Sequence, residues 1–330
     1  MEKMFIDKIM GGIRNPKKLL IYVLHRIGII FSDKTYLKIL FRLHMGHKLN
    51  IDNPQTYNEK LQWLKLYNQK PEYTQLVDKA LFKEYIAHTL GEEYIIPTIG
   101  VYDKFDDIDF ASLPNQFVLK CTHDSGGLII CRDKNILDLK KAKRKINDCL
   151  KRNYFYTWRE WPYKNVKPRI IIEQFISTEK LDVNIENLKS IDTDILQKKY
   201  GLLDYKFMCF DGEVKALFLD IGVVTGSEGH AEEYFRSVYD KDWNVMNVKE
   251  TREHYPIPIE KPQFLDKMVK IAERLSVGHP HIRVDLYHIN NQIYVGELTF
   301  YHGSGMGNLF IPAAWDYKFG EWIKLPNTNE

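Results

Sequence analysis

Polar and apolar residues alternate on both sides of an Asn-Asn pair in the stretch RVDLYHINNQIYVGELTFYHGSG, residues 283–305. Alternation of this kind is typical of strands with one buried face, so the stretch predicts a β-hairpin. The positions expected to face the core are apolar, namely Val284, Leu286, Leu298 and Phe300. The positions expected on the opposite face are polar, namely Arg283, Asp285, Glu297 and Thr299.

The turn decides which residues of this hairpin lie opposite each other. A two-residue turn, Asn290-Asn291, would pair Asp285 with Gly296 and send Glu297 to the other face. A three-residue turn at 290–292 would place Asp285 opposite Glu297, and Arg283 opposite Thr299, on one face. The polarity pattern favours the three-residue turn.

Patterns elsewhere in the chain predict the remaining elements. Thr56 and Glu59 form a capping box that begins a helix. Near-continuous apolar residues at 168–176 predict a buried strand, and Asp211-Gly212 predicts the turn of a second hairpin. Further elements are expected as helices at about 74–90, 139–151 and 263–276, strands near 94–102, 116–121 and 128–132, and a polar, irregular segment at 177–201. This order predicts an α+β fold with mostly antiparallel sheets rather than a βαβ repeat.

Composition is that of an ordinary globular protein. The chain has 330 residues, of which 44% are hydrophobic and 28% charged, enough for one large domain or two to three subdomains. Its four cysteines have no C-x-x-C spacing, so we expect reduced thiols in a cytoplasmic protein rather than a zinc site.

Basic residues gather at the beginning of the chain. Residues 1–50 hold ten Lys or Arg against three acidic residues. The apolar stretch 19–31 is too short to span a bilayer and is interrupted by His25 and Arg26. The segment therefore fits either peripheral contact with an anionic membrane or a helical cap on the main domain. No nucleic-acid motif accompanies the basic excess, so nucleic acid is not an expected partner.

Two carboxylates facing each other, Asp285 and Glu297, repel unless a positive charge lies between them. Mg²⁺ with nucleotide phosphates would supply that charge, because Mg²⁺ prefers carboxylate oxygens. Arg283 on the same face could also satisfy both acids. The hairpin alone leaves these two interpretations open.

Two lysines on expected strands add to the candidate chemistry. Lys120 precedes the loop Ser125-Gly126-Gly127, and a glycine loop lets backbone N–H groups approach phosphates. Lys206 shares a strand face with Asp204 in LDYKFMCF. Each signal is weak by itself, since an ordinary hairpin turn or an edge lysine would look the same.

Together these segments resemble the ATP-grasp superfamily, and more narrowly its TupA-type family, named for teichuronopeptide synthesis. The resemblance runs from about residue 35 to the end and rests on NPQTYNEKLQWLK, LPNQFVLKCTHDSGG, REWPYKNVKPRIIIEQFI, DYKFMCFDG and IRVDLY…VGELTFY. It implies two α+β subdomains that grip a nucleotide between antiparallel sheets. The implied division is a basic helical segment at 1–52, a helix and strand subdomain at 53–115, and an ATP-grasp domain at 116–330. Within the last, the nucleotide lid spans about 116–175 and the catalytic part about 202–330.

The resemblance also implies roles for individual residues. Lys120 and Lys206 would contact nucleotide phosphates, beneath a lid made by Ser125, Gly126 and Gly127. Asp285 and Glu297 would be Mg²⁺ ligands, with Thr299 standing where superfamily members commonly have Asn. Arg283, with Lys206, would act in catalysis by stabilising the acyl-phosphate. The adenine would lie against Glu173, Gln174, Phe175 and Ile176, and the ribose-binding acid is open among Glu179, Asp182 and Asp204.

The activity that the resemblance implies is ATP-dependent joining of a carboxylate to an amine through an acyl-phosphate. The expected partners are ATP, Mg²⁺, an amino acid or other amine, and a uronic acid or similar carboxylate of a bacterial surface or capsular polysaccharide. The acceptor end is expected in 150–165, in 222–235 and after Thr299. Two alternatives stay open, a phosphotransferase on the same fold and an inactive nucleotide-binding module.

Overall fold

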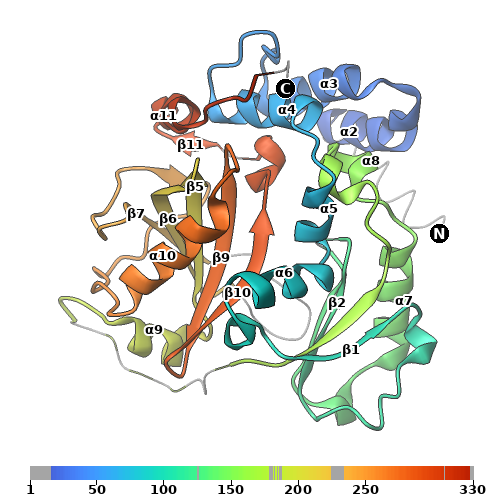
Figure 1. Ribbon diagram of the computed structural model, residues 1–330, viewed down its shortest axis with the longest axis vertical. Coiled ribbons are helices and arrows are strands. Elements are labelled where there is room, and N and C mark those ends of the chain that lie inside the picture. Colours follow the sequence, from blue (N-terminus) through green and yellow to red (C-terminus); the bar gives the residue numbers. More distant parts are fainter. Residues whose placement is uncertain are drawn as a thin grey trace.

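The computed structural model describes residues 16–124, 126–177, 181, 183, 185, 188–223, 234–307 and 309–327. Two antiparallel sheets dominate the architecture (Figure 1). The first has the strand order β1-β4-β2-β3, built from Thr98–Tyr102, Ile170–Gln174, Phe117–Cys121 and Leu128–Cys131. The second has the order β10-β9-β5-β6-β7, built from Gln292–Thr299, Ile282–Ile289, Asp204–Phe210, Glu213–Ile221 and Phe235–Tyr239. The expected α+β class with antiparallel sheets is confirmed.

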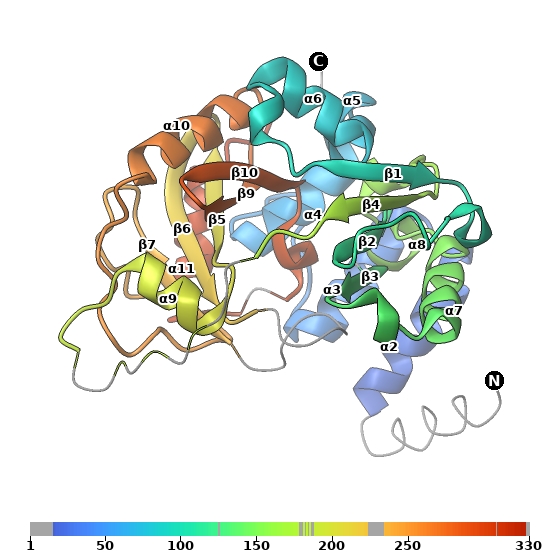
Figure 2. The same ribbon diagram turned by 90° about the horizontal axis from the view of Figure 1, so that it is seen from below.

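Helices cover the outer side of each sheet. Helix α10 (Leu265–Ser276) packs on the five-stranded sheet and α7 (Leu139–Leu150) on the four-stranded sheet (Figure 2). Among the described residues, the other α-helices are α2 (Pro16–Ile27), α3 (Asp33–Met45), α4 (Tyr57–Tyr67), α5 (Glu72–Val77), α6 (Leu81–Thr89), α8 (Phe155–Trp158), α9 (Thr193–Tyr200) and α11 (Ala314–Trp322). A small sheet pairs β8 (Lys249–Glu250) with β11 (Phe310–Ile311).

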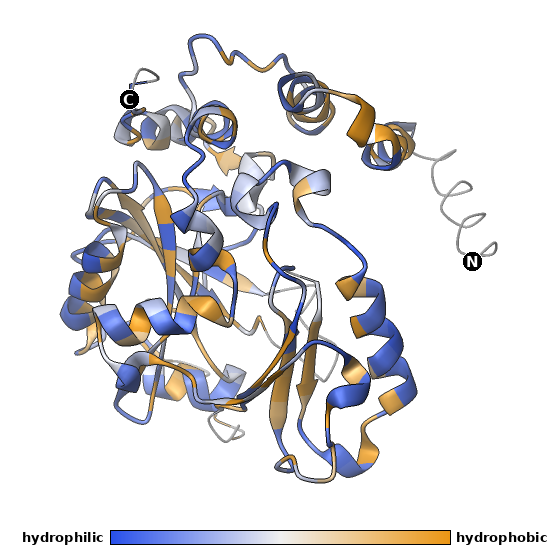
Figure 3. Ribbon diagram, turned by 45° about the vertical axis from the view of Figure 1, so that its right-hand side comes forward, coloured by the Kyte–Doolittle hydropathy of each residue, from blue (hydrophilic) through white to orange (hydrophobic). Residues whose placement is uncertain are grey.

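Short 3₁₀ helices connect several of these elements. They are η1 (Gly28–Ile30), η2 (Glu92–Tyr94), η3 (Phe105–Asp107), η4 (Lys134–Ile136), η5 (Trp161–Tyr163) and η6 (His302–Gly305). Apolar residues concentrate on the strands of both sheets, whereas the outer faces of the covering helices are hydrophilic (Figure 3). One apolar core surrounds the five-stranded sheet, a second lies between the four-stranded sheet and α7, and a third joins α2 to α3.

Strands β9 and β10 form the hairpin predicted around Asn290-Asn291, and its turn differs from the expected one. Gln292 pairs with Ile289, so the turn has two residues, Asn290 and Asn291, both with positive φ. Such φ values are those of a type I′ turn, for which Asn is favoured. The predicted three-residue turn is therefore wrong.

The predicted pairing of the polar residues is nevertheless confirmed, because a β-bulge shifts the register further along the hairpin. The shift falls between Val295 and Glu297, and it leaves Asp285 opposite Glu297 and Arg283 opposite Thr299. A Cβ added at Gly296, inside the bulge, would lie 2.6 Å from Cε2 of Tyr287. Glycine thus permits the close approach on which this register depends.

The single helix expected at 74–90 is two helices, α5 and α6, separated at residues 78–80. Asp78 is extended, and its carboxylate accepts the backbone N–H groups of Ala80 at 2.9 Å and Leu81 at 3.3 Å. Lys79 donates its backbone N–H to the carbonyl of Thr122, next to β2. Side-chain competition with the helical hydrogen bonds and a tertiary partner together break the helix.

The remaining expected elements agree with the structure more closely. The capping box of Thr56 and Glu59 begins α4, and Asp211-Gly212, both with positive φ, turns the β5–β6 hairpin. The segment 177–201, expected to be irregular, contains α9 with Asp192 as its N-cap. Glu179 and Asp182, two of the candidate ribose-binding acids, lie outside the described residues.

No helix in the described part of the chain is long and apolar enough to cross a membrane. Helices α2 and α3 lie with α4 and α11 at the top end of the molecule in Figure 1. They are joined to α8 through Arg159, which donates to the carbonyl of Gly28 at 2.6 Å and lies 4.0 Å from the ring centroid of Tyr36.

Candidate functional site

One face of the five-stranded sheet carries a row of charged residues across three strands. Lys206 on β5 pairs with Asp285 on β9, which in turn pairs with Glu297 on β10. Arg283 on β9 lies in the next row, opposite Thr299. Side chains alternate between the faces of a strand, so these residues share the face opposite to Val284, Leu286 and Leu298. Those three are buried in the core, as expected.

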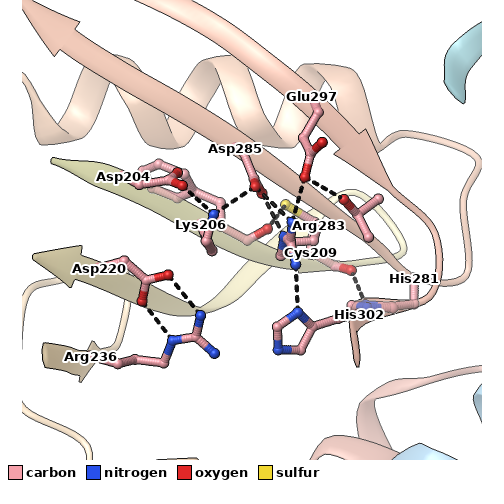
Figure 4. A network of polar contacts seen from close by, with 12 residues as sticks. Asp204, Lys206, Cys209, Asp220, Arg236, His281, Arg283, Asp285, Glu297 and His302 are labelled. Atoms are coloured by element: carbon pink, nitrogen blue, oxygen red, sulfur yellow. Dashed lines mark hydrogen bonds and ion pairs between the residues drawn. The ribbon is translucent and has the colours of Figure 1, made fainter. Parts of the chain in front are cut away.

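Ion pairs join the members of this row (Figure 4). Lys206 donates to Asp285 Oδ2 at 2.9 Å and also to Asp204. Arg283 donates to both carboxylate oxygens of Asp285, from Nε at 2.6 Å and from Nη2 at 2.7 Å. Its Nη2 reaches Glu297 Oε1 at 2.8 Å. Arg283 therefore lies between the two facing carboxylates, as one of the two sequence interpretations required.

Burial differs sharply between these two carboxylates. The side chain of Asp285 is 1% exposed and that of Glu297 is 41% exposed. Burial disfavours ionisation of Asp285, but Arg283 and Lys206 outweigh it and hold the pKa of Asp285 well below its usual range. Thr299 donates its hydroxyl to Glu297 Oε1 at 3.3 Å, so it contacts the more exposed acid.

Asp204, at the beginning of β5, is a second unusual carboxylate. Burial raises its pKa to about 7, although Lys206 acts in the opposite direction. Its Oδ1 is buried without a hydrogen-bond partner among the described residues. An unpartnered buried oxygen is costly for a folded protein, and a ligand that donates to it or coordinates it would remove the cost.

The four-stranded sheet contributes the other lysine that the sequence singled out. Lys120 on β2 lies 2.6 Å from Glu173 Oε2 on β4. Lys83 on α6, which sequence reasoning missed, lies 2.5 Å from Glu173 Oε1. Burial raises the pKa of Glu173, but the two ammonium groups outweigh it and lower the value to about 2. The carboxylate of Glu173 thus forms ion pairs with two lysines instead of being available to contact a base.

A cavity of about 150 Å³ lies between the two sheets. Its wall includes Lys120, Glu173, Gln174, Phe175 and Ile176 from the first sheet, and Asp204 and Tyr287 from the second. Apolar side chains form much of the rest, namely Ile96, Val118, Leu128, Ile130, Leu202 and Val223. The structure therefore brings the predicted base-binding residues together in one apolar cavity with a few polar groups, the usual character of a small-molecule site.

The glycine loop that was expected to cover the phosphates follows β2. Ser125 lies outside the described residues. Gly126 donates its backbone N–H to Asp124 Oδ1 at 3.0 Å, and Gly127 accepts the N–H of Cys121 at 2.7 Å. A Cβ at Gly127 would lie 2.5 Å from Cys121 Sγ, so this glycine is required for the packing of the hairpin itself.

Beyond Arg283, three distant segments meet at η6. Ser304 donates its hydroxyl to the buried Glu160, and Lys65 of α4 donates to the carbonyls of Ser304 at 2.8 Å and Trp158 at 3.0 Å. Ser304 has a φ of +53°, an uncommon value for a residue other than glycine. Burial lowers the pKa of Lys65 to about 8 and raises that of Glu160.

Sequence reasoning also missed a buried polar chain behind Arg283. His302 of η6 accepts from Arg283 Nη1 at 2.6 Å, and Glu250 of β8 lies 3.2 Å from His302 Nε2. Arg236 of β7 binds Glu250 and, through two bonds, Asp220 of β6. Only Asp220, at the end of the apolar run KALFLDI, carried a local signal, since an acid there breaks the apolar pattern.

The carboxylate oxygens on this sheet face could supply part of the ligand set of a hard divalent cation. Asp285 and Glu297 are opposed carboxylates, and Asp204 has an orphaned oxygen nearby in the same face. Within the described residues, however, no group of three or more His, Cys, Asp or Glu side chains is close enough to hold a metal by itself. Such a set suits Mg²⁺ that is bound together with phosphate oxygens, since Mg²⁺ usually takes only one or two carboxylates from the protein.

Two facing antiparallel sheets with a charged, partly apolar cavity between them define an ATP-grasp fold. The chain belongs to the TupA-like ATP-grasp family, whose model matches residues 59–324. None of the curated proteins compared with the chain matches it.

Solved structures with a similar arrangement are ATP-grasp proteins of low sequence identity. D-alanine-D-alanine ligase from Helicobacter pylori is 13% identical, with 83% of this chain and 70% of that chain covered and a TM-score of 0.40. D-cycloserine synthetase DcsG is 15% identical, with 88% and 79% covered and a TM-score of 0.39. The ATP-grasp ligase PsnB, solved with a phosphomimetic variant of minimal precursor, Mg and ADP, is 9% identical, with 81% and 66% covered and a TM-score of 0.39. Similarity at this level says nothing about the substrate of this chain.

Proposed function

We propose that the protein is an ATP-dependent carboxylate–amine ligase that works through an acyl-phosphate. The observation that carries the proposal is the juxtaposition of two features. A cavity of about 150 Å³ holds Lys120 and the segment 173–176, and the adjoining sheet face holds Lys206, Arg283, Asp285 and Glu297. Membership of the TupA-like ATP-grasp family supports it.

The proposed roles follow the order of residues across the site. The base lies in the apolar cavity against Gln174, Phe175 and Ile176, and Asp204 accepts from the ribose or coordinates the cation. Lys120 and Lys206 bind phosphate oxygens as point charges. Asp285 and Glu297, with Thr299 beside Glu297, hold Mg²⁺, which when bound neutralises charge on the nucleotide phosphates.

The proposed ligation has two steps, formation of an acyl-phosphate and its reaction with the amine. An oxygen of the substrate carboxylate bonds to the γ-phosphorus of ATP while the bond to the β,γ-bridging oxygen breaks, and ADP leaves. The amine nitrogen then bonds to the acyl carbon, the bond from that carbon to the phosphate-bearing oxygen breaks, inorganic phosphate leaves with that oxygen, and the amine gives up a proton. Arg283 stabilises the negative charge on the acyl-phosphate and on the tetrahedral intermediate, because its buried guanidinium is fixed in position before reaction.

The acceptor end of the site is the junction at η6. Two of the three segments expected there do meet, since Ser304 binds Glu160 and Lys65 binds both Ser304 and Trp158. Most of the third, residues 224–233, lies outside the described residues. We propose that this junction receives a uronic acid or similar carboxylate of a bacterial surface polysaccharide, and an amino acid as the amine.

Calorimetry with Mg·ATP tests nucleotide binding first. We expect the wild-type protein to bind ATP only with Mg²⁺, and Asp285→Asn with Glu297→Gln to lose binding while keeping its circular dichroism spectrum. Glu213→Gln is the matched control, because Glu213 is an exposed carboxylate on the same sheet. Absence of Mg²⁺-dependent binding by the wild type would reject the nucleotide site and favour a relative that has lost its nucleotide and serves as a scaffold.

A substrate screen then separates ligase from phosphotransferase. Uronic acids are supplied with Mg·ATP, first with hydroxylamine and then with each amino acid. A ligase releases ADP and phosphate only with a carboxylate present, and hydroxylamine traps its acyl-phosphate as a hydroxamate. A stable phosphorylated sugar without hydroxamate would establish the phosphotransferase and reject the ligase.

We also propose that the protein contacts an anionic membrane surface from the cytoplasmic side through α2 and η1. Leu20, Val23, Ile27 and Ile30 follow a helical i, i+3, i+7, i+10 spacing, and their exposed fractions run from 42% to 74%. Residues 16–32 contain Lys17, Lys18 and Arg26 and no acidic residue. An exposed apolar stripe flanked by cations suits a lipid surface with negative charge.

Vesicle co-sedimentation tests this surface. We expect the protein to pellet with phosphatidylglycerol vesicles and not with phosphatidylcholine vesicles, and Leu20→Ser with Ile27→Ser to stay in the supernatant. Ile136→Ser is the matched control, because Ile136 is 82% exposed but lies on η4. Equal pelleting of the stripe variant, or a wild type that only self-associates in light scattering, would reject the membrane contact.

A further inference from the structure

A buried chain of hydrogen bonds runs from Arg283 away from the proposed metal ligands. Arg283 Nη1 lies 2.6 Å from His302 Nδ1, and His302 Nε2 lies 3.2 Å from both oxygens of Glu250. Arg236 binds Glu250 and holds Asp220 through bonds of 2.6 Å and 2.7 Å. All five residues are buried. Figure 4 shows His302 beneath Arg283, and Arg236 with Asp220 further along the same face.

The hydrogen bonds fix which nitrogen of His302 carries the proton. A guanidinium has only donors, so Nδ1 must accept from Arg283. A neutral imidazole has one acceptor nitrogen, and the proton therefore lies on Nε2, where it is donated to Glu250. Burial lowers the pKa of His302, which agrees with the neutral ring that this arrangement needs. Against the effect of burial, the hydrogen bond from His302 and the charge of Arg236 lower the pKa of Glu250, so Glu250 is a carboxylate and accepts.

His302 differs from the other partners of Arg283. Nε and Nη2 of the guanidinium contact Asp285 and Glu297, the residues to which the proposed function assigns Mg²⁺. Lone pairs of these carboxylates that coordinated a cation would no longer accept from the guanidinium, so these contacts would weaken with Mg·ATP bound. Among the side chains that the structure describes, His302 is the partner of Arg283 that holds no proposed metal ligand role.

We propose that His302, oriented by Glu250, is the positioning residue that keeps the Arg283 guanidinium in place when Mg·ATP occupies the site. Glu250 fixes the imidazole tautomer, and Arg236 with Asp220 fixes Glu250. Phe218 supports the arrangement from the sheet, with its ring centroid 5.6 Å from that of His302 and 5.4 Å from the Arg236 guanidinium carbon. This inference rests on the proposed function, because it assumes that Arg283 stabilises the acyl-phosphate.

Nitrogen-15 NMR of the full chain with labelled histidine tests the tautomer without any turnover. We expect the His302 signals, assigned by their loss in His302→Asn, to show an unprotonated Nδ1 and a protonated Nε2 with and without Mg·ATP. Glu250→Leu, which removes the acceptor at Nε2, should let the ring lose its contact with Arg283 and exchange between tautomers. A protonated Nδ1 in the Mg·ATP complex would overturn the proposal, since Arg283 could not then donate to it.

Kinetics of the same variants test the consequence for Arg283. With the carboxylate found by the substrate screen, we expect His302→Phe to lower kcat by about 10- to 100-fold, the usual effect of losing a partner that orients a site residue. The Kd for Mg·ATP should change less than threefold. His302→Asn, which keeps one acceptor and one donor, should recover part of kcat, and Glu253→Gln, an exposed neighbour of Glu250, should match the wild type.

The two proposals fail in different ways. If Asp285→Asn leaves Mg·ATP binding unchanged, the proposed function is wrong. If Asp285→Asn abolishes binding but a folded His302→Phe keeps kcat within twofold of the wild type, the role of His302 is wrong and the proposed function stands. A folding defect in His302→Phe is detected by its thermal unfolding, and His302→Asn then decides the kinetic comparison.

Discussion

Glu173 holds two lysines that come from different parts of the chain, Lys120 from β2 and Lys83 from α6. A buried carboxylate between two cations stabilises the fold only while it is ionised, and removing it leaves two half-buried like charges close together. The residue therefore links stability to the charge of the proposed nucleotide site.

We predict that Glu173→Gln lowers the free energy of unfolding by about 3 kcal/mol at pH 6, since one pKa unit corresponds to about 1.4 kcal/mol. The folded-state pKa of Glu173, about 2, lies below that of an unfolded chain, so the stabilisation is present above pH ~4.5 and is lost as the pH falls towards 2. Urea unfolding at pH 6 and at pH 3 measures the difference. Glu213→Gln, an exposed control, should show no such difference. An equal loss for Glu173→Gln at both pH values would contradict the electrostatic origin.

At this scale, sequence reasoning found the residues whose neighbours lie on the same strand or on the partner strand of a hairpin. Arg283, Asp285, Glu297 and Lys206 stood out because they occupy the polar positions of strands in which polar and apolar residues alternate. Lys83, Glu250 and His302 did not, because their partners are far away in the sequence and nothing local distinguishes them. Ion pairs between residues that are far apart in the sequence can be identified only from the folded structure.

At the scale of elements, the bulge at Gly296 sets the geometry of the site. The strands themselves follow from alternation, but the register does not, because it depends on the ring of Tyr287 lying against a residue without a side chain. The break between α5 and α6 likewise depends on Thr122, which accepts from Lys79 across the fold. Contacts of this kind are the reason that the turn and the single helix were predicted wrongly.

We predict that Gly296→Ala destabilises the protein by about 1–3 kcal/mol, the typical cost of forcing an extra carbon into a packed site. The new Cβ would lie 2.6 Å from the Tyr287 ring, which lines the cavity, so Mg·ATP binding should weaken as well. Thermal unfolding and calorimetry measure the two effects. Gly126→Ala is the control for stability, because its Cβ would meet nothing closer than 3.8 Å. Unchanged stability in Gly296→Ala would show that the bulge is not held by this contact.

At the scale of the whole molecule, one arginine connects the N-terminal helices to the proposed acceptor side of the site. Arg159 donates to the carbonyl of Gly28 at 2.6 Å, pairs with Asp33 at 2.8 Å and lies over the ring of Tyr36. Its neighbour in the chain, Glu160, binds Ser304 in η6. Arg159 and Glu160 therefore connect the helices of the proposed membrane surface directly to the junction where the acceptor is proposed to bind.

We predict that Arg159→Met loosens α2 and α3 from the rest of the molecule, because it removes a buried cation and leaves the Gly28 carbonyl and Asp33 without that partner. Limited proteolysis should cut the variant faster within residues 46–56, between α3 and α4, and its free energy of unfolding should fall by about 2–4 kcal/mol. Mg·ATP affinity should stay within threefold of the wild type, because the nucleotide cavity contains no residue of α2, α3 or α8. Arg152→Met, at a residue whose side chain is 61% exposed, is the control. A different result would be an increase in the Kd for Mg·ATP by the same factor as the increase in the cleavage rate. The helical segment and the two sheets would then unfold as one cooperative unit, and the N-terminal helices would support the proposed nucleotide site as well as the proposed acceptor junction.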